Sequence, residues 1–174
     1  VYLYLRGRAN REGVCWPAIP TMARELKMSE STIRRALRDL VREGFLVIDE
    51  VPAVGFFESL VNFVDAVSGK STNFFDRPSV PELKKNHLAM LEDLIRRDKN
   101  HACVIAWSLF NEPDTMSESA VPYFADIFAK ARELDVQKRP RTFAMELNSS
   151  PEKCTCHQFS DFLCFNRYYG WYLL

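Results

Sequence analysis

The chain has no long apolar run, no net charge and no apparent internal repeat or low-complexity segment. No stretch approaches the roughly 18 consecutive apolar residues of a membrane-spanning helix, so we expect no membrane segment. Of the 174 residues, 47% are hydrophobic and 13% are aromatic. This composition is typical of a chain that buries a core and excludes a disordered protein.

The cysteines follow no disulfide framework: they are odd in number and irregularly spaced. They are Cys15, Cys103, Cys154, Cys156 and Cys164. This pattern favours a reducing cytoplasm over an oxidising compartment. No signal peptide opens the chain, which begins with Val1 rather than Met, so we expect a trimmed or incomplete reading frame. Cys154-Thr155-Cys156-His157 has no second ligand pair at zinc-site spacing, so we expect no metal and no cofactor.

The net charge of zero conceals two unlike parts. Residues 1–45 hold nine Lys and Arg against five Asp and Glu, which gives +4. Residues 46–174 hold fourteen Lys and Arg against eighteen Asp and Glu, which gives −4. A small basic segment suits contact with phosphates, whereas an acidic one does not. Many solvated helix faces carry as many arginines, so an ordinary surface explains the difference equally well.

Two helices joined by a short turn are predicted near the amino terminus. Residues 19–26 and 32–43 carry apolar residues at helical spacing, and Lys27-Met28-Ser29 forms the turn. Ser29 or Ser31 can cap the second helix, and Gly44 ends it. Its apolar face comprises Ile33, Ala36, Leu37, Leu40 and Val41, and its exposed face comprises Arg34, Arg35, Arg38 and Arg42.

The segment VYLYLRGRANREGVCWPAIPTMARELKMSESTIRRALRDLVREGFL resembles the winged helix-turn-helix domains of bacterial replication and transcription proteins. The resemblance implies DNA contacts by Arg34, Arg35 and Arg38 on the second helix. The wing expected after that helix is missing, so a solvated arginine face is an equally good interpretation. We predict a helix-turn-helix segment over residues 1–45 and a second domain over residues 46–174.

From residue 46 the apolar pattern alternates between strands and helices. Strands are predicted at 46–49, 104–109, 142–146 and 163–167, and helices at 81–97 and 119–134. A long Phe-rich loop is expected at 51–79. Such alternation is typical of an α/β protein with a parallel sheet and right-handed crossovers.

The run VIAWSLFNEPD (Val104–Asp114) is the most informative stretch of the chain. Its apolar, β-branched start suits a strand that is covered on both faces. Pro113 cannot donate to a sheet ladder, so the strand ends there and Glu112 lies at its carboxyl end. In parallel sheets and barrels that end is where chemistry takes place, which makes Glu112 a candidate general acid/base.

Three segments resemble glycoside hydrolase family 2, specifically its β-glucuronidases. They are VIDEVPAVG (47–55), RRDKNHACVIAWSLFNEPDT (96–115) and DFLCFNRYYGWY (161–172). The resemblance covers residues 46–174 and implies a partial (β/α)8 TIM barrel, about strands three to six. Glu112 then matches the acid/base of a retaining mechanism, and Asn111 the residue that binds the neighbouring sugar hydroxyl. Asn166, Tyr168 and Tyr172 match residues that line the sugar pocket.

The resemblance also implies a nucleophile on a seventh strand, in a segment like ITEYG that is not among these 174 residues. We therefore expect a β-glucuronidase-like piece that hydrolyses no glucuronide detectably by itself, and galactosidase or mannosidase relatives stay open. Four strands leave two open sheet edges, which a homo-oligomer would cover. The alternatives are a DNA-binding helix-turn-helix protein, or a fusion of two gene fragments without selected activity, joined between about Arg42 and Val47.

Overall fold

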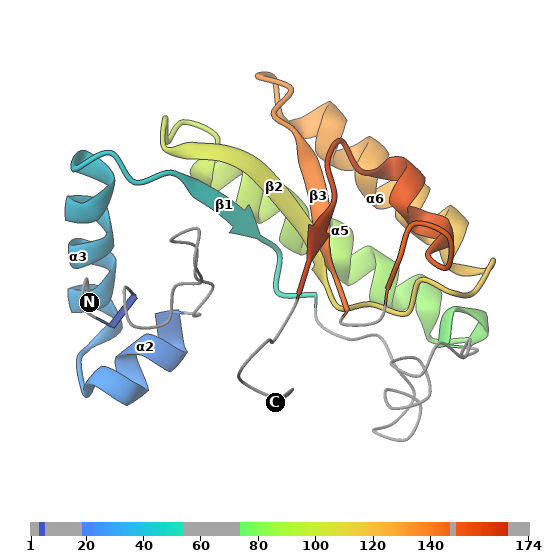
Figure 1. Cartoon of the computed structure of the whole chain (residues 1–174), viewed down its shortest axis with the longest axis horizontal. Helices are drawn as coiled ribbons and strands as arrows, with labels where there is room; N and C mark the ends of the chain where they lie inside the picture. Colours follow the sequence, from blue (N-terminus) through green and yellow to red (C-terminus); the bar gives the residue numbers. More distant parts are fainter. Residues whose placement is uncertain (1–3, 6–18, 54–73, 147–148, 167–174) are drawn as a thin grey trace. The chain divides into compact units, whose positions relative to one another are not determined.

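The structure is a computed structural model that describes residues 4–5, 19–53, 74–146 and 149–166 (Figure 1). The chain divides into two compact units, Val1–Leu46 and Val47–Leu174, which are described separately below. Within the described residues, every helix is too short or too polar to cross a lipid bilayer.

In the first unit, helix α2 (Ile19–Leu26) packs against helix α3 (Glu30–Arg42). The buried side chains of this pair are Met22 and Ile33, each at most 2% exposed. The prediction of two helices around a short turn is confirmed, and Lys27 in that turn has a positive φ of 53°.

Both ends of α3 are closed by local hydrogen bonds. The Ser29 hydroxyl accepts the backbone N–H of Thr32 at 3.2 Å, so the helix begins at Glu30 rather than at the predicted Thr32. At the other end, Gly44 has φ +94° and its N–H donates to the carbonyl of Val41. The N–H of Phe45 donates to Leu40, which completes a Schellman motif and ends the helix as predicted.

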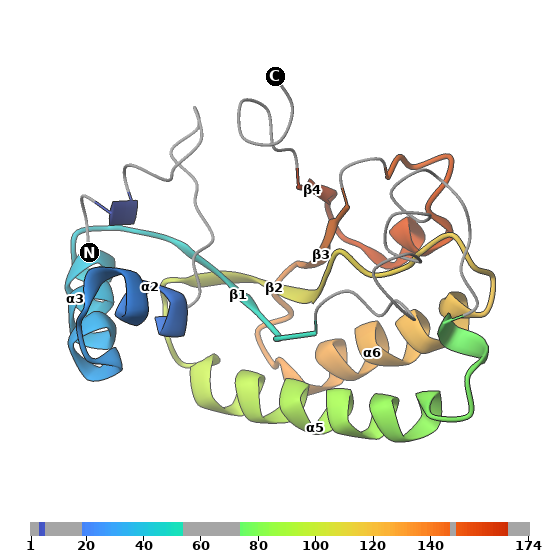
Figure 2. The ribbon, with the colours of Figure 1, turned by 90° about the horizontal axis from the view of Figure 1, so that it is seen from below.

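The second unit is built on a parallel sheet with the strand order β1-β2-β3-β4. The described strands are β1 (Val47–Glu50), β2 (Val104–Asn111), β3 (Arg141–Met145) and β4 (Cys164–Phe165). Helix α5 (Val80–Asp98) connects β1 to β2 and helix α6 (Ala120–Leu134) connects β2 to β3, with both helices on one face of the sheet (Figure 2). Short 3-10 helices occur at Phe74–Asp76 and Thr155–Phe159. The α/β prediction is therefore confirmed.

Aromatic side chains fill the layer between the sheet and the two helices. The ring of Phe110 on β2 stacks on Phe124 of α6 with centroids 4.0 Å apart, and Phe143 of β3 meets Phe124 edge-on at 5.2 Å. Leu91 and Ile95 complete the layer from α5 and are fully buried. Met90 of the same helix, by contrast, is 37% exposed.

His87 of α5 is a structural histidine. Its Nε2 lies 3.0 Å from the carbonyl oxygen of Leu109 and its Nδ1 lies 3.2 Å from the hydroxyl of Tyr123. Burial disfavours the charged imidazole and lowers the pKa of His87 to about 4. The neutral ring thus joins α5, β2 and α6.

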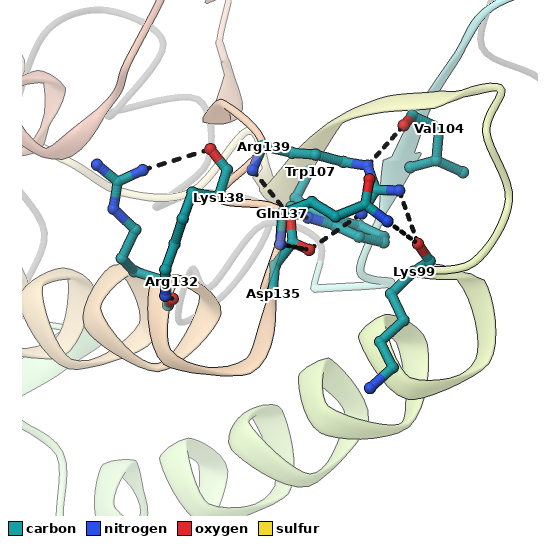
Figure 3. A network of polar contacts seen from close by, with 8 residues as sticks. All are labelled: Lys99, Val104, Trp107, Arg132, Asp135, Gln137, Lys138 and Arg139. Atoms are coloured by element: carbon teal, nitrogen blue, oxygen red, sulfur yellow. Dashed lines mark hydrogen bonds and ion pairs between the residues drawn. The ribbon is translucent and has the colours of Figure 1, made fainter.

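A buried carboxylate, Asp135, organises the loop between α6 and β3 (Figure 3). It accepts the indole N–H of Trp107 at 2.9 Å and the guanidinium of Arg139 at 3.0 Å. It also accepts the backbone N–H groups of Gln137 and Arg139. Burial by itself would raise the pKa of Asp135, but these hydrogen bonds and the Arg139 charge lower it overall. Arg139 in turn donates to the carbonyls of Val104 and Lys99, both at 2.7 Å.

We predict that Asp135→Ala destabilises the sheet unit by about 3–5 kcal/mol, because it leaves the Arg139 cation buried and unpaired. Urea unfolding followed by circular dichroism measures this change. Glu133→Ala is the matched control. The Glu133 side chain is 69% exposed and forms a surface ion pair with Lys130, which contributes about 0.5 kcal/mol or less to stability. Equal losses in the two variants would contradict the role assigned to Asp135.

Asp49 of β1 lies beside Asp98 at the end of α5. Burial, followed by the hydrogen bond and the negative charge of Asp98, raises the pKa of Asp49 to about 7 from an ordinary 3.8. Arg97 donates its Nε–H to Asp98 at 2.7 Å, which keeps the proton on Asp49 rather than on Asp98. The folded chain therefore binds a proton here that the unfolded chain releases.

This shift predicts a loss of stability as pH rises, because a folded pKa above the unfolded one favours folding most below the unfolded value. The free energy of unfolding of Asp49→Asn, relative to the parent chain, should increase steadily between pH 4 and pH 7. The lowered pKa of His87 makes the free energy of unfolding rise with pH over the same range. Because His87 is present in both chains, its contribution cancels in the difference. Urea unfolding across pH 4–8 provides the measurement, with Asp93→Asn on the exposed side of α5 as the control. A difference that does not change with pH would refute the prediction.

Candidate active site

The residues Asn111 and Glu112 lie where β2 leaves the sheet. The backbone N–H of Asn111 donates to the carbonyl of Ala53 at 2.9 Å, and that of Glu112 donates to Ala144 of β3 at 2.8 Å. The two residues are thus bonded to the segments on both sides of β2. Pro113 follows without an N–H group, so the ladder stops there.

A register irregularity in β2 decides which face Asn111 occupies. Ser108 is in register with Glu50 of β1 and its hydroxyl donates to that carboxylate. Since the preceding residue, Asp49, lies beside Asp98 of α5, Glu50 and Ser108 lie on the face opposite the helices. Phe110, two residues later, packs on the helix side against Phe124, although a regular strand would place it on the same face as Ser108. The register with β3 shifts between Ser108 and Asn111, as in a β-bulge. This shift returns Asn111 to the face opposite the helices.

Glu112 adopts a left-handed backbone conformation with φ +49°. For a residue with a side chain this conformation costs about 1–2 kcal/mol, and such strain concentrates at functional sites. The conformation turns the chain out of the sheet while the Glu112 side chain stays at its carboxyl edge.

Asn166 brings the ends of β2 and β4 together. Its side-chain Nδ2 donates to Glu112 Oε1 at 2.9 Å and to Asn111 Oδ1 at 3.1 Å. Its backbone N–H donates to Met145 of β3 at 2.9 Å, which fixes its position. Because β3 lies between β2 and β4, the Asn166 side chain must cross that strand. Ala144, in register with Asn111, offers only a methyl group at the crossing.

A second carboxyl group, that of Glu50, lies on the same face. The Ser108 hydroxyl donates to Glu50 Oε2 at 2.6 Å. Loss of hydration raises the pKa of Glu50, and the negative charge of Glu112 adds to this rise. The thiol of Cys164 is also close, since burial and then the Glu50 charge raise its pKa. From the sequence, Asp49 and Glu50 are equally good candidates for a place near the site, because two adjacent carboxylates at the end of a strand do not reveal which one faces it.

Three of the predicted site residues, Asn111, Glu112 and Asn166, therefore lie in direct contact. Tyr168 and Tyr172 lie outside the described residues. Arg34, Arg35 and Arg38 are exposed on α3 in the other unit, and Arg34 pairs with Glu30 at 2.9 Å. Within the described ranges, no group of His, Cys, Asp and Glu side chains could hold a metal ion.

The three contacting side chains offer a carboxyl group that can give or take a proton beside an amide that can bind a hydroxyl group. A carboxyl group placed in this way could act as a general acid or base toward a ligand that the amide holds.

Comparison with known families agrees with this division of the chain. Residues 35–174 match the family described as "Glycosyl hydrolases family 2, TIM barrel domain", and residues 1–46 match a "Helix-turn-helix domain". The two matches overlap at residues 35–46.

Individual relatives share one printed name. The chain is 45% identical over 131 residues to a β-glucuronidase of Paenibacillus borealis, covering 75% of this chain and 20% of that protein. It is 38% identical over 132 residues to a β-glucuronidase of Streptococcus agalactiae, and the match covers 76% of this chain and 21% of that protein. The crystal structure of Ruminococcus gnavus β-glucuronidase in complex with uronic isofagomine matches with 57% identity and a TM-score of 0.70, over 76% of this chain and 22% of that one. The chain thus spans about a fifth of the length of the curated relatives it matches.

Proposed function

The chain belongs to glycosyl hydrolase family 2 through its TIM barrel domain, and from this membership we propose that it supplies the acid/base side of a β-glucuronidase-type active site. The observation that carries the proposal is the contact of Asn166 with both Asn111 and Glu112 at the carboxyl edge of the sheet. The substrate class is a β-glucuronide, in keeping with the names of the relatives.

In this proposal the reaction is a retaining hydrolysis. Glu112 donates its proton to the glycosidic oxygen while a second carboxylate attacks the reacting carbon, which releases the aglycone as an alcohol. Glu112, now ionised, removes a proton from water, and that water displaces the second carboxylate from the sugar. Asn111 holds the hydroxyl group next to the reacting carbon in both steps.

The resemblance to the family puts the second carboxylate on a strand that follows β4. The test therefore supplies that strand from a relative: residues 47–166 replace the matching segment of the Ruminococcus gnavus enzyme, which is 57% identical. We expect this graft to hydrolyse aryl β-glucuronides, whereas the 174-residue polypeptide alone should not do so detectably.

In the graft, Glu112→Ala should lower kcat/KM by about 10²–10⁴ for a substrate with a poor leaving group. The loss should be much smaller for a leaving group that departs without protonation. Glu118→Ala, which removes an exposed carboxylate six residues away in the chain, should leave both substrates unaffected. Equal losses for the two substrates would show that Glu112 is not the proton donor.

Residues 1–46 support a second candidate function, DNA binding, because they match a helix-turn-helix domain and expose arginines on α3. Arg34 is engaged with Glu30, so Arg35 and Arg38 are the better candidates for phosphate contacts. This activity would be independent of the sugar site.

For the full chain we predict DNA binding that weakens as salt rises, with Arg35→Ala and Arg38→Ala each reducing the salt slope by about one. Fluorescence anisotropy with a labelled duplex at several salt concentrations measures the slope. Arg96→Ala, an exposed arginine on α5, is the matched control and should change nothing. A DNA affinity that does not depend on salt concentration would rule this function out. So would an Arg96→Ala variant that changes the salt slope as much as Arg35→Ala and Arg38→Ala do.

A cytoplasmic location and a homo-oligomer stay predictions. A fusion of two gene fragments without selected activity predicts neither turnover nor salt-dependent DNA binding by the 174-residue chain, but it is compatible with turnover in the graft, which supplies the missing strand.

A further inference from the structure

We propose that Thr155 is a positioning residue for Glu112: it fastens the loop that follows Glu112 and so holds the backbone of the acid/base in its left-handed conformation. The inference deepens the proposed function and rests on it for its catalytic meaning. The mechanical part, in which Thr155 restrains the backbone of Glu112, can be tested without any turnover.

The loop between β2 and α6 is fastened at Thr115. The carbonyl oxygen of Thr115 accepts two hydrogen bonds from Thr155, one from its backbone N–H at 3.1 Å and one from its hydroxyl at 3.0 Å. A carbonyl oxygen has two lone pairs, so these two donors use its full accepting capacity. The two residues are 40 positions apart in the chain. The contact is therefore a tertiary anchor for the loop.

Thr155 can serve as an anchor because the 3-10 helix that it begins, Thr155–Phe159, is built into the core. Cys154 and Cys156, on either side of Thr155, are at most 1% exposed. Phe159, at the end of the same helix, packs against Phe128 of α6 with ring centroids 6.1 Å apart. A movement of Thr155 would disturb this close packing, so its two donors are held in place.

The path along the chain from this anchor to the acid/base is short and stiff. Only Pro113 and Asp114 separate Glu112 from Thr115. The ring of Pro113 fixes its own φ at about −65°. The carboxylate of Asp114 accepts the backbone N–H of Met116 at 3.1 Å, which forms an Asx turn. Little backbone freedom is thus left between the anchor and Glu112.

The conformation of Glu112 is the reason that such an anchor matters. At φ +49° a residue with a side chain is strained, and the strain persists only where neighbouring contacts fix the backbone. On one side, the N–H of Glu112 donates to the carbonyl of Ala144 at 2.8 Å. On the other side, Thr155 holds Thr115. Restrained on both sides, the carboxyl group keeps its direction while it gives up and takes back a proton.

The test of the restraint uses the full chain and backbone ¹⁵N relaxation measured by nuclear magnetic resonance. Thr155→Val keeps the shape of the side chain and the backbone N–H but removes the hydroxyl donor. We expect added motion at Glu112, seen as an order parameter below the roughly 0.85 of rigid backbone or as exchange on the μs–ms timescale. Trp107, whose N–H donates to Pro140 earlier in the same strand, should stay rigid. Relaxation at Glu112 that does not change in Thr155→Val would overturn the proposal.

Two further variants separate the hydrogen bond from a general disturbance of the segment. Thr155→Ser keeps both donors and should leave Glu112 as rigid as in the parent chain. Ser160→Ala removes a hydroxyl that is buried in the same segment but has no hydrogen-bond partner within the described residues, and it should also leave Glu112 rigid. Added motion in all three variants would show that the segment, and not the Thr155 hydroxyl, is responsible, which would refute the assignment.

The catalytic test uses the graft described above. For a substrate with a poor leaving group, Thr155→Val should lower kcat/KM about 3- to 10-fold, the effect of losing one neutral hydrogen bond. For a leaving group that departs without protonation the loss should be less than about twofold, because a misdirected acid impairs only the step that needs its proton. Thr155→Ser should restore the parent value, and Ser160→Ala should change neither substrate.

A smaller amount of folded enzyme would slow both substrates equally, so equal losses in Thr155→Val would refute positioning. An inactive parent graft, together with added motion at Glu112 in the full chain, would overturn the proposed function but not the restraint by Thr155.

Discussion

The carboxylate of Asp135 is the interaction on which the geometry of the sheet unit depends. It joins the indole of Trp107 on β2 to the loop that starts β3, through Arg139 and two backbone N–H groups. Trp107 is in register with Arg141, the first residue of β3. The network therefore sets the alignment of two parallel strands whose carboxyl ends carry the site. Parallel strands share no hairpin that could set this alignment, so a tertiary contact must do so.

From that fixed point, the β-bulge in β2 determines what the site contains. Between the pairs Trp107–Arg141 and Asn111–Ala144, β2 advances one residue more than β3. Without this extra residue Asn111 would lie among the aromatic rings on the helix side, where Phe110 now packs. The bulge buries Phe110 and presents Asn111 to the opposite face. A hydrophobic requirement and a catalytic one are thereby met within two consecutive residues.

The sequence was sufficient to predict the elements of both units, because helical spacing, Ser29, Gly44 and the Asn-Glu-Pro turn are local signals. It also placed Glu112 at the end of a strand. It could not reveal the bulge, because the apolar run before Asn111 has no alternation from which a face can be read. Nor could it separate Glu50, which faces the site, from Asp49, which faces α5: that division depends on tertiary neighbours, Ser108 and Asp98. The contact of Asn166 with Asn111 joins residues that are 55 positions apart, and no local pattern encodes it.

The overlap of the two family matches at residues 35–46 has a physical basis. This segment contains the second half of α3, its Schellman cap at Gly44 and the apolar residues that precede β1. A helix that ends in this way and continues as an apolar strand satisfies a helix-turn-helix domain followed by a wing. It equally satisfies the helix-to-strand transition of a βα barrel. Because the requirement of backbone geometry is the same in both folds, one sequence can meet it for both. The site at Asn111, Glu112 and Asn166, by contrast, meets the requirements of only one of these families, and for that reason it carries the functional argument.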